Sequence, residues 1–391
     1  MKNNWQKVKL GDICGYSRSR IPISEVNLHN YVSTENLLKE RGGKIIAGKI
    51  PEQSNFYEYN KGCTLVSNIR PYFKKIWFAD IRGGCSNDVL VYTPNKGIND
   101  KWLYYLLSQD SFFDFVMSGA KGTKMPRGDK SQIMKFSVAL PPLDEQKKIA
   151  EILSALDDKI ELNNKINRNL EAQAQAIFKS WFIDFEPFKN GKFIDSELGK
   201  IPEGWKVGNL SDIANITMGQ SPNGNSYNEK KIGMIFFQGR AEFGWRFPRN
   251  RLYTTAPKRI AERDSVLLSI RAPVGDINKA LERCCIGRGL ATLTSNHKTF
   301  LYYKMQSIRH LLDVYNGEGT VFGSINKNTL QEIRTIIPID SEIIRFELKL
   351  KVVDELIRNN YIENLRLMKL RNALLPELMS GKIDILRFSN R

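Results

Sequence analysis

The chain has 391 residues, of which 41% are hydrophobic and 26% are charged, so it is long enough for two or three globular domains. Its formal net charge of +17 at pH 7 indicates a polyanionic partner. No apolar run has the roughly 20 residues of a membrane span, no signal-peptide core is found, and the five cysteines lack metal-ligand spacing, so we expect a cytoplasmic protein without metal or membrane contact.

Residues 1–141 are predicted to form a globular domain of short strands separated by glycine-containing loops. The segment begins with a motif around Trp5 and continues through the run Leu65–Pro71. A glycine loop at 119–123 then leads to a strand-like run that ends at Pro141.

Residues 142–184 have a different pattern, typical of one long helix. Apolar residues alternate in steps of four and three from Ile149 to Trp181. A mean step of 3.5 residues predicts the seam of a left-handed coiled coil. Asn163 and Asn167 occupy seam positions, where a buried amide fixes register and partner at some cost in stability.

After a predicted linker at 185–204, the same landmarks recur in the same order. Residues 205–338 repeat the domain, with echoes at Trp205, in Leu267–Pro273, at 317–320 and in the run that ends at Pro338. Residues 339–391 repeat the helix at an offset of 197, and Asn360 and Asn364 fall at the corresponding seam positions.

The repeat predicts an α+β chain with two similar recognition domains in tandem, each followed by a long helix. The two helices are expected to pair as an antiparallel coiled coil. The alternative is two independent amphipathic helices, each packed only on its own domain.

The basic charge lies in the two predicted domains. Residues 1–140 carry a net charge of +9 and residues 196–337 carry +8, whereas the two helical segments are nearly balanced. This distribution favours two separate nucleic-acid-binding domains over a basic helix that enters a groove. The alternative is a solvated basic surface without a partner.

Candidate DNA-binding residues are the basic and amide side chains that lie among aromatic residues and glycines. Arginine can bind guanine, glutamine can bind adenine, and lysine mostly neutralises phosphate. Arg70 and Arg271 have a rival role as salt-bridge residues that determine the fold, because they occupy matching motifs. The candidates are Arg70, Lys74, Lys75, Lys124, Arg127, Lys130, Gln238, Arg240, Arg246, Arg249, Arg271 and Arg288.

The sequence contains no nucleotide-binding phosphate loop and no Asn/Asp-Pro-Pro-Tyr/Phe tetrapeptide of a DNA adenine methylase. We therefore expect no catalytic residue and no bound cofactor. Two alternatives remain open: an enzyme with divergent motifs, and a noncatalytic basic protein that binds nucleic acid without sequence specificity or binds an acidic protein.

Four stretches together resemble the specificity subunits of type I restriction-modification systems: Pro141–Gln146, Asp195–Trp205, Ser269–Asp276 and Cys285–Gly289. The resemblance covers essentially the whole chain, although Ser341–Ile343 departs from the pattern at the start of the second helix. It implies that each domain reads one half of a split, asymmetric duplex DNA target and that the helices set the spacer.

The resemblance also implies partner subunits. Two modification subunits would carry S-adenosylmethionine, and up to two restriction subunits would use ATP and magnesium. This chain itself would contribute recognition and no chemistry.

Overall fold

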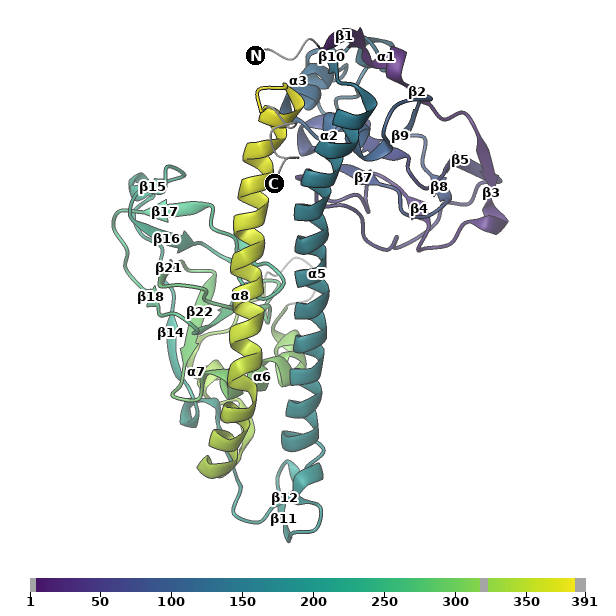
Figure 1. The fold of residues 1–391 in the computed structure, drawn as a ribbon. Coiled ribbons are helices and arrows are strands. Elements are labelled where there is room, and N and C mark those ends of the chain that lie inside the picture. Colours follow the sequence, from purple (N-terminus) through teal and green to yellow (C-terminus); the bar gives the residue numbers. More distant parts are fainter. Residues whose placement is uncertain (1–4, 317–322, 384–391) are drawn as a thin grey trace, which may run out of the picture. The chain divides into compact units, whose positions relative to one another are not determined.

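The structure, a computed structural model, describes residues 5–316 and 323–383, and these divide into two compact units. Unit 1 comprises Met1–Leu162 with Glu363–Arg391, and unit 2 comprises Asn163–Ile362. Two 40-residue helices, α5 (Leu143–Phe182) and α8 (Asp340–Met379), each contribute one part to each unit (Figure 1). In the described ranges no helix is both long and apolar enough to cross a membrane.

Unit 1 contains two four-stranded sheets, with strand orders β2-β9-β6-β7 and β3-β5-β8-β4. Every neighbouring pair is antiparallel except β4 and β8, which run parallel. A separate pair, β1 and β10, joins the beginning of the domain to its end. The strands and shorter helices are β1 (Gln6–Lys9), α1 (Leu10–Ile13), β2 (Cys14–Tyr16), β3 (Arg20–Pro22), β4 (Tyr31–Val32), β5 (Asn55–Tyr59), β6 (Thr64–Ser67), β7 (Ile76–Phe78), β8 (Gly83–Cys85), β9 (Val89–Pro94), α2 (Asp100–Leu107), α3 (Asp110–Ser118), α4 (Lys130–Ile133) and β10 (Ser137–Leu140).

Unit 2 has a four-stranded sheet of order β14-β22-β19-β20 and a five-stranded sheet of order β15-β17-β16-β21-β18. Two further antiparallel pairs are β13 with β23 and the linker hairpin β11–β12. The elements are β11 (Phe193–Ser196), β12 (Gly199–Pro202), β13 (Lys206–Asn209), β14 (Asn215–Met218), β15 (Tyr227–Asn228), β16 (Met234–Phe237), β17 (Leu252–Thr254), β18 (Ile260–Ala261), β19 (Val266–Ser269), β20 (Ile277–Lys279), β21 (Cys284–Ile286), β22 (Leu290–Thr294), α6 (Lys298–Ser307), α7 (Lys327–Gln331) and β23 (Arg334–Ile337).

The predicted tandem repeat is confirmed by strand pairing. The sheet β2-β9-β6-β7 of unit 1 corresponds to β14-β22-β19-β20 of unit 2, and the parallel pair β4–β8 corresponds to β16–β21. Both central strands, β6 and β19, are buried at all four residues, which is expected for strands covered on both faces. The second predicted glycine loop, at 317–320, lies outside the described residues.

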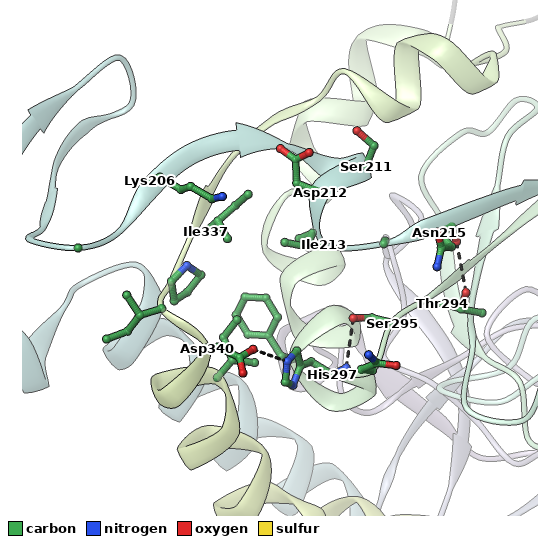
Figure 2. A pocket seen from close by; sticks show the side chains of 17 residues that line it. Lys206, Ser211, Asp212, Ile213, Asn215, Thr294, Ser295, His297, Ile337 and Asp340 are labelled. Carbon is green, nitrogen blue, oxygen red and sulfur yellow. Dashed lines mark hydrogen bonds and ion pairs between the residues drawn. The ribbon is translucent and has the colours of Figure 1, made fainter.

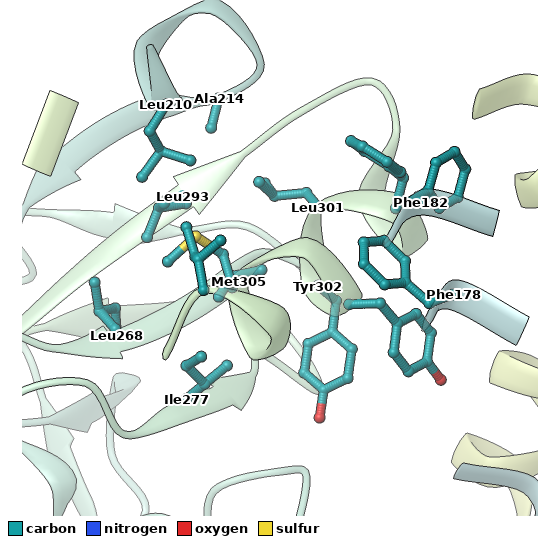
Figure 3. Packing of buried hydrophobic residues seen from close by; sticks show 14 of the residues in the cluster. Phe178, Phe182, Leu210, Ala214, Leu268, Ile277, Leu293, Leu301, Tyr302 and Met305 are labelled. Carbon is teal, nitrogen blue, oxygen red and sulfur yellow. The ribbon is translucent and has the colours of Figure 1, made fainter. Parts of the chain in front are cut away.

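The core of unit 2 contains side chains from both the sheet and α5. Phe178 and Phe182 of α5 lie on the side of α6 that carries Leu301, whereas Met305 of α6 lies beside Leu293 of the sheet, and all five belong to one buried cluster (Figure 3). Burying a side chain of this size contributes about 1.5–3 kcal/mol. The helix seam is therefore also a face of the domain core, and in unit 1 Leu153 of α5 has the same role.

Within each unit the two helices run antiparallel, as the heptad pattern predicts. In unit 1 Arg371 binds Asp157 at 2.6 Å, and Lys159 lies 3.5 Å from Glu363. In unit 2 the Asn360 side chain donates to Asn167 Oδ1 at 2.9 Å. Further along α5 in unit 2, the Phe178 ring lies 5.7 Å from that of Phe346. In each unit, higher residue numbers on α5 thus contact lower numbers on α8, so the alternative of two independent helices is wrong.

The predicted seam asparagines lie at the helix contact. Asn163, Asn167 and Asn364 are buried, and Asn360 is half-buried. Asn167 donates to the Ile357 carbonyl at 3.2 Å, and Asn364 donates to the Ile160 carbonyl at 3.4 Å. These bonds give the amides the polar partners that a buried position requires. Their role in fixing register remains a prediction.

We expect Asn360→Leu alone to lower the free energy of unfolding by about 1–3 kcal/mol, because buried Asn167 Oδ1 loses its donor. The double variant Asn167→Leu/Asn360→Leu should be at least as stable as the wild type, since both polar groups are removed together. Chemical denaturation followed by circular dichroism measures both. A double variant less stable than the single one would contradict the role given to this pair.

Candidate nucleic-acid interface

In unit 1 the structure brings the predicted residues of two loops together. The β6–β7 loop and the glycine loop that precedes α4 are joined by backbone bonds, from Arg70 N to the Pro126 carbonyl at 2.8 Å and from Gly128 N to the Asn68 carbonyl at 3.3 Å. Arg127 pairs with Lys121 through two 2.9 Å backbone bonds. The loops that carry the six predicted residues from Arg70 to Lys130 therefore form one edge.

The β6–β7 loop has an unusual backbone. Arg70 and Lys74 both adopt left-handed conformations, with φ of 50° and 49°, on either side of the short 3-10 helix Pro71–Phe73. Residues other than glycine adopt this region at a cost of about 1–3 kcal/mol, and such outliers cluster at functional sites. Tyr72 is 44% exposed within this turn, so an aromatic side chain stands among the cations.

The unit 1 cations differ in whether an acid already neutralises them. Lys74 lies 2.7 Å from Asp110 and Arg127 lies 3.1 Å from Asp88. Hydrogen bonds from Lys74 and then Arg41 lower the pKa of Asp110, so this carboxylate stays ionised. Lys75 donates to the Thr34 carbonyl, and burial lowers its pKa.

Three of the six candidate cations of unit 1 have no such partner. Lys124 and Lys130 are exposed and form no ion pair with any residue in the described ranges. The half-buried Arg70 likewise forms none, and its Nε has no hydrogen-bond partner among the described residues. Its rival role as a fold-determining salt-bridge residue therefore finds no support, and these three are the candidates of unit 1 with most charge free for phosphate or bases.

In unit 2 a second group forms where the β16 end meets the turn between β21 and β22. Gln238 Nε2 donates to Ser221 Oγ at 2.9 Å, and Ser221 Oγ also accepts from Arg288 N at 3.2 Å. A Cβ at Gly287 or Gly289 would lie 2.9 Å from the Gln238 backbone, so glycine permits this approach. Gln238 and the exposed Arg288 are thereby held together.

Two further arginines lie beside this group. Arg240 pairs with Asp276 at 2.8 Å, and Asp276 also binds Arg309 at 2.7 Å. Arg271 is exposed, its backbone bridges to Ser324, and it forms no ion pair among the described residues. The salt-bridge role that the sequence left open for Arg271 is therefore also unsupported.

Backbone pairing corrects the correspondence between Arg70 and Arg271. Arg70 N bonds the Pro126 carbonyl as Ala272 N bonds the Gly323 carbonyl, whereas Arg271 bridges to Ser324 as Ile69 bridges to Arg127. The two arginines are thus one position out of step. Arg271 therefore corresponds to Ile69 of unit 1, and Arg70 corresponds to Ala272 of unit 2, so the two arginines are not equivalent residues.

Arg246 was predicted to bind DNA, and that prediction is wrong because the side chain is only 1% exposed. Its guanidinium binds Glu171 of α5 and lies 2.5 Å from Asp354 of α8. It also donates to the Tyr303 hydroxyl at 3.1 Å. Lys279, 5% exposed, lies 2.7 Å from the same Asp354. Two buried cations thus face two buried carboxylates in a neutral cluster.

Unit 1 has a related contact built from different residues. Tyr105 donates to Asp157 at 2.8 Å, as Tyr303 of the matching Leu-Tyr-Tyr motif lies 3.4 Å from Asp354. In unit 1 the cation beside the aspartate is Arg371, which comes from α8 and not from the recognition domain. The spacing of Tyr and Asp was visible in the sequence, but nothing there indicated which cation would join them.

A pocket of about 760 Å³ lies at the start of α8 in unit 2, and it has a different character (Figure 2). His297 Nε2 lies 2.8 Å from Asp340 Oδ1, and Asp212 lines the same space with Lys206. Carboxylates equal or outnumber cations here, which disfavours phosphate. The pocket borders Thr294 at the end of β22, whereas Arg288 lies just before the beginning of the same strand. Because the pocket and the candidate DNA-binding group lie at opposite ends of β22, we assign the pocket no DNA contact.

Sequence reasoning missed the unit 1 counterparts of Gln238 and Arg288. In the parallel strand pair of unit 1, Ser86 N bonds the Val32 carbonyl, and in that of unit 2, Gly287 N bonds the Phe237 carbonyl. Val32 therefore corresponds to Phe237, and Cys85 corresponds to Ile286. Ser33 and Asn87 therefore occupy these positions in unit 1. No sequence similarity links the two pairs, so only strand register identifies them.

Comparison with known proteins places this geometry in context. The family model described as type I restriction modification DNA specificity domain matches residues 2–172 and 202–370. The MjaX specificity subunit of Methanocaldococcus jannaschii is 35% identical over 308 residues, covering 76% of this chain and 72% of the relative. The type I restriction enzyme HindI specificity subunit of Haemophilus influenzae is 24% identical, covering 97% of this chain and all of the relative (100%). The crystal structure of a type I restriction-modification S subunit from M. genitalium shares the fold, with a TM-score of 0.60, 16% identity and 96% coverage of both chains.

Proposed function

Because the chain belongs to the family of type I restriction-modification DNA specificity subunits, we propose that its two units read the two unlike halves of one split duplex target. The chain is a sequence-specific DNA recognition subunit. In this proposal each unit contacts DNA through the loop edge described above, and the paired helices set the length of the unread spacer.

The observation that carries the proposal is that the two units share the same backbone pairing at their loop edges but carry different side chains there. The loop edges of the two units are joined by matching backbone bonds, yet Ser33 and Asn87 stand in unit 1 where Gln238 and Arg288 stand in unit 2. Base edges are distinguished by the donors and acceptors that face them. Equivalent loops with unlike donors should therefore select unlike sequences.

We further propose that this chain contributes recognition and no catalytic step. Two modification subunits would bring S-adenosylmethionine, and up to two restriction subunits would bring ATP and magnesium, in the cytoplasm. The family membership supports these partners, and the residues in the described ranges hold no group of three or more potential metal ligands of the His, Cys, Asp and Glu types.

Selection from random duplex DNA by the full chain, alone and co-expressed with its modification subunit, tests the proposal. We expect one motif with two different halves at a fixed gap. A palindrome would contradict the claim of unlike halves. Steep loss of binding in salt without any enriched sequence would instead favour the rival function, a basic protein that binds nucleic acid without specificity.

Lys124→Ala should reduce the slope of log K against log salt by about 1, because the side chain has no acid partner and is free to neutralise a phosphate. Lys74→Ala is the matched control, since Asp110 already neutralises Lys74, and it should change the slope less. Titration of one duplex at several salt concentrations measures both. An equal change in the two variants would contradict the ranking by ion pairing.

A further inference from the structure

The loop 239–251 of unit 2 exposes one large aromatic side chain directly before two buried residues. Trp245 is 49% exposed, whereas Arg246 is 1% exposed and Phe247 is 2% exposed. Of the six tryptophans in the chain, all of which are described, Trp245 is the one in the exposed class. Tryptophan is enriched at binding interfaces because its large ring buries much apolar surface on contact, so an exposed tryptophan on a loop held at both sides favours a contact with a partner.

The loop is anchored on both sides of Trp245. The Gly244 N–H donates to Asn278 Oδ1 at 3.0 Å, and the Asn278 side chain donates back to the Gly244 carbonyl at 3.0 Å. The Lys279 N–H donates to the Arg246 carbonyl at 2.8 Å. Residues 244 and 246 are therefore both tied to β20 and its edge, and the tryptophan between them has little freedom to fold inward.

The side chains of the next two residues fix the loop to the helices of the same unit. Arg246 reaches Glu171 and Asp354 in the neutral cluster described above. The Phe247 ring lies 5.0 Å from that of Tyr361 on α8. Since burying an ion pair is worthwhile only when its geometry is fixed, Arg246 restricts the loop more than an apolar residue would.

The surroundings of Trp245 indicate the chemistry of its partner. Arg249 is exposed and has no ion pair among the described residues, and Arg240 is 44% exposed at the other end of the loop. The loop begins directly after Gln238, which Ser221 holds beside Arg288. An aromatic ring within a basic, glycine-containing surface suits contact with base edges in a groove of the duplex, where the thymine methyl group offers an apolar surface.

We propose that Trp245 is a base contact of the half-site read by unit 2, and that Arg246 is the positioning residue that holds it at the DNA. This inference rests on the proposed function and adds two residues to it: one that discriminates bases and one that acts only through the first. It also gives a role to a buried arginine in a loop that carries the exposed Arg240, Trp245 and Arg249.

The test measures binding of the full chain to the selected target and to targets with each base pair changed in turn. The unit 2 half-site is the half at which Arg288→Ala alters discrimination. We expect Trp245→Ala to reduce discrimination at one or two adjacent base pairs there by about 10-fold, with the other half-site unchanged, because the apolar contact with the base edge is lost. Trp245→Phe should retain most of the discrimination at these base pairs.

Arg246→Met should weaken discrimination at the same base pairs, and the double variant with Trp245→Ala should be no worse than Trp245→Ala alone. Such non-additivity separates positioning from a general loss of stability. Where Arg246→Met does not fold, Phe247→Leu weakens the other anchor without leaving a buried charge. Leu348→Ala is the control, because it removes an apolar side chain that is 70% exposed on α8 of the same unit.

Two results would overturn the inference and leave the proposed function intact. In the first, Trp245→Ala discriminates every base pair as the wild type does. In the second, it weakens binding to all duplexes equally, which would make Trp245 a nonspecific contact. Failure of the wild type to select any sequence would instead refute the proposed function, and the inference with it.

Discussion

Asp354→Ala is expected to lower the free energy of unfolding by about 3–5 kcal/mol. The carboxylate lies 2.5 Å from Arg246 and 2.7 Å from Lys279, and it also accepts a hydrogen bond from Thr299 at 3.0 Å. Its removal leaves two buried cations with only Glu171 as an acidic partner. An uncompensated buried charge is among the few mechanisms by which one substitution costs this much.

Chemical denaturation followed by circular dichroism measures this loss. Glu355→Ala is the matched control, because Glu355 is the next residue on α8 but is exposed, and its removal should change stability by less than about 0.5 kcal/mol. Equal stability of the two variants would show that the buried cluster contributes nothing to the fold.

The same aspartate gives a pH dependence of known sign. Burial opposes ionisation of Asp354, but Lys279 and Arg246 attract the charged form more strongly, so its pKa in the folded chain lies below the ordinary 3.8. A lowered pKa stabilises the folded state above about pH 4, and this contribution is lost as the pH falls through the folded pKa. The stability difference between the wild type and Asp354→Ala should therefore narrow below pH 4.

The heptad pattern predicted the helices well because coiled-coil packing is local and repetitive. Steps of four and three place one face of α5 inward, and Leu153 and Asn167 are buried there. The tandem repeat was equally visible, since Trp205 and Asp212 recur in register with Trp5 and Asp12. Both features follow from spacing along the chain.

The side chains at the DNA edge were less predictable because their roles depend on contacts distant in sequence. Arg246 looks like Arg249 in the sequence, yet Glu171 and Asp354, 75 and 108 residues away, bury it. Arg70 and Arg271 fall in similar motifs, yet strand register sets them one residue apart. Composition predicted that the positive charge lies in the two recognition domains, but it could not separate exposed cations from buried, structural ones such as Arg246.

Replacing both Gln238 and Arg288 with alanine should reduce discrimination at the unit 2 half-site by about 100-fold. Each bidentate contact of these residue types with a base contributes about 1–3 kcal/mol. Ser221 Oγ accepts from Gln238 Nε2 at 2.9 Å and from the Arg288 backbone N–H at 3.2 Å, so the two residues lie side by side and can read neighbouring bases. Competition binding against targets with one altered half measures the loss.

Arg283→Ala is the control for this prediction, because Arg283 is a 60% exposed arginine of the same unit that pairs with Glu262 at 3.0 Å. The double variant Ser33→Ala/Asn87→Ala should produce the mirror result, with discrimination lost only in the other half-site. If the unit 2 variant affected both halves equally, the two units would not read DNA independently. Loss confined to one half in each case would mean that two copies of one backbone obtain unlike specificities from the few side chains at equivalent strand ends.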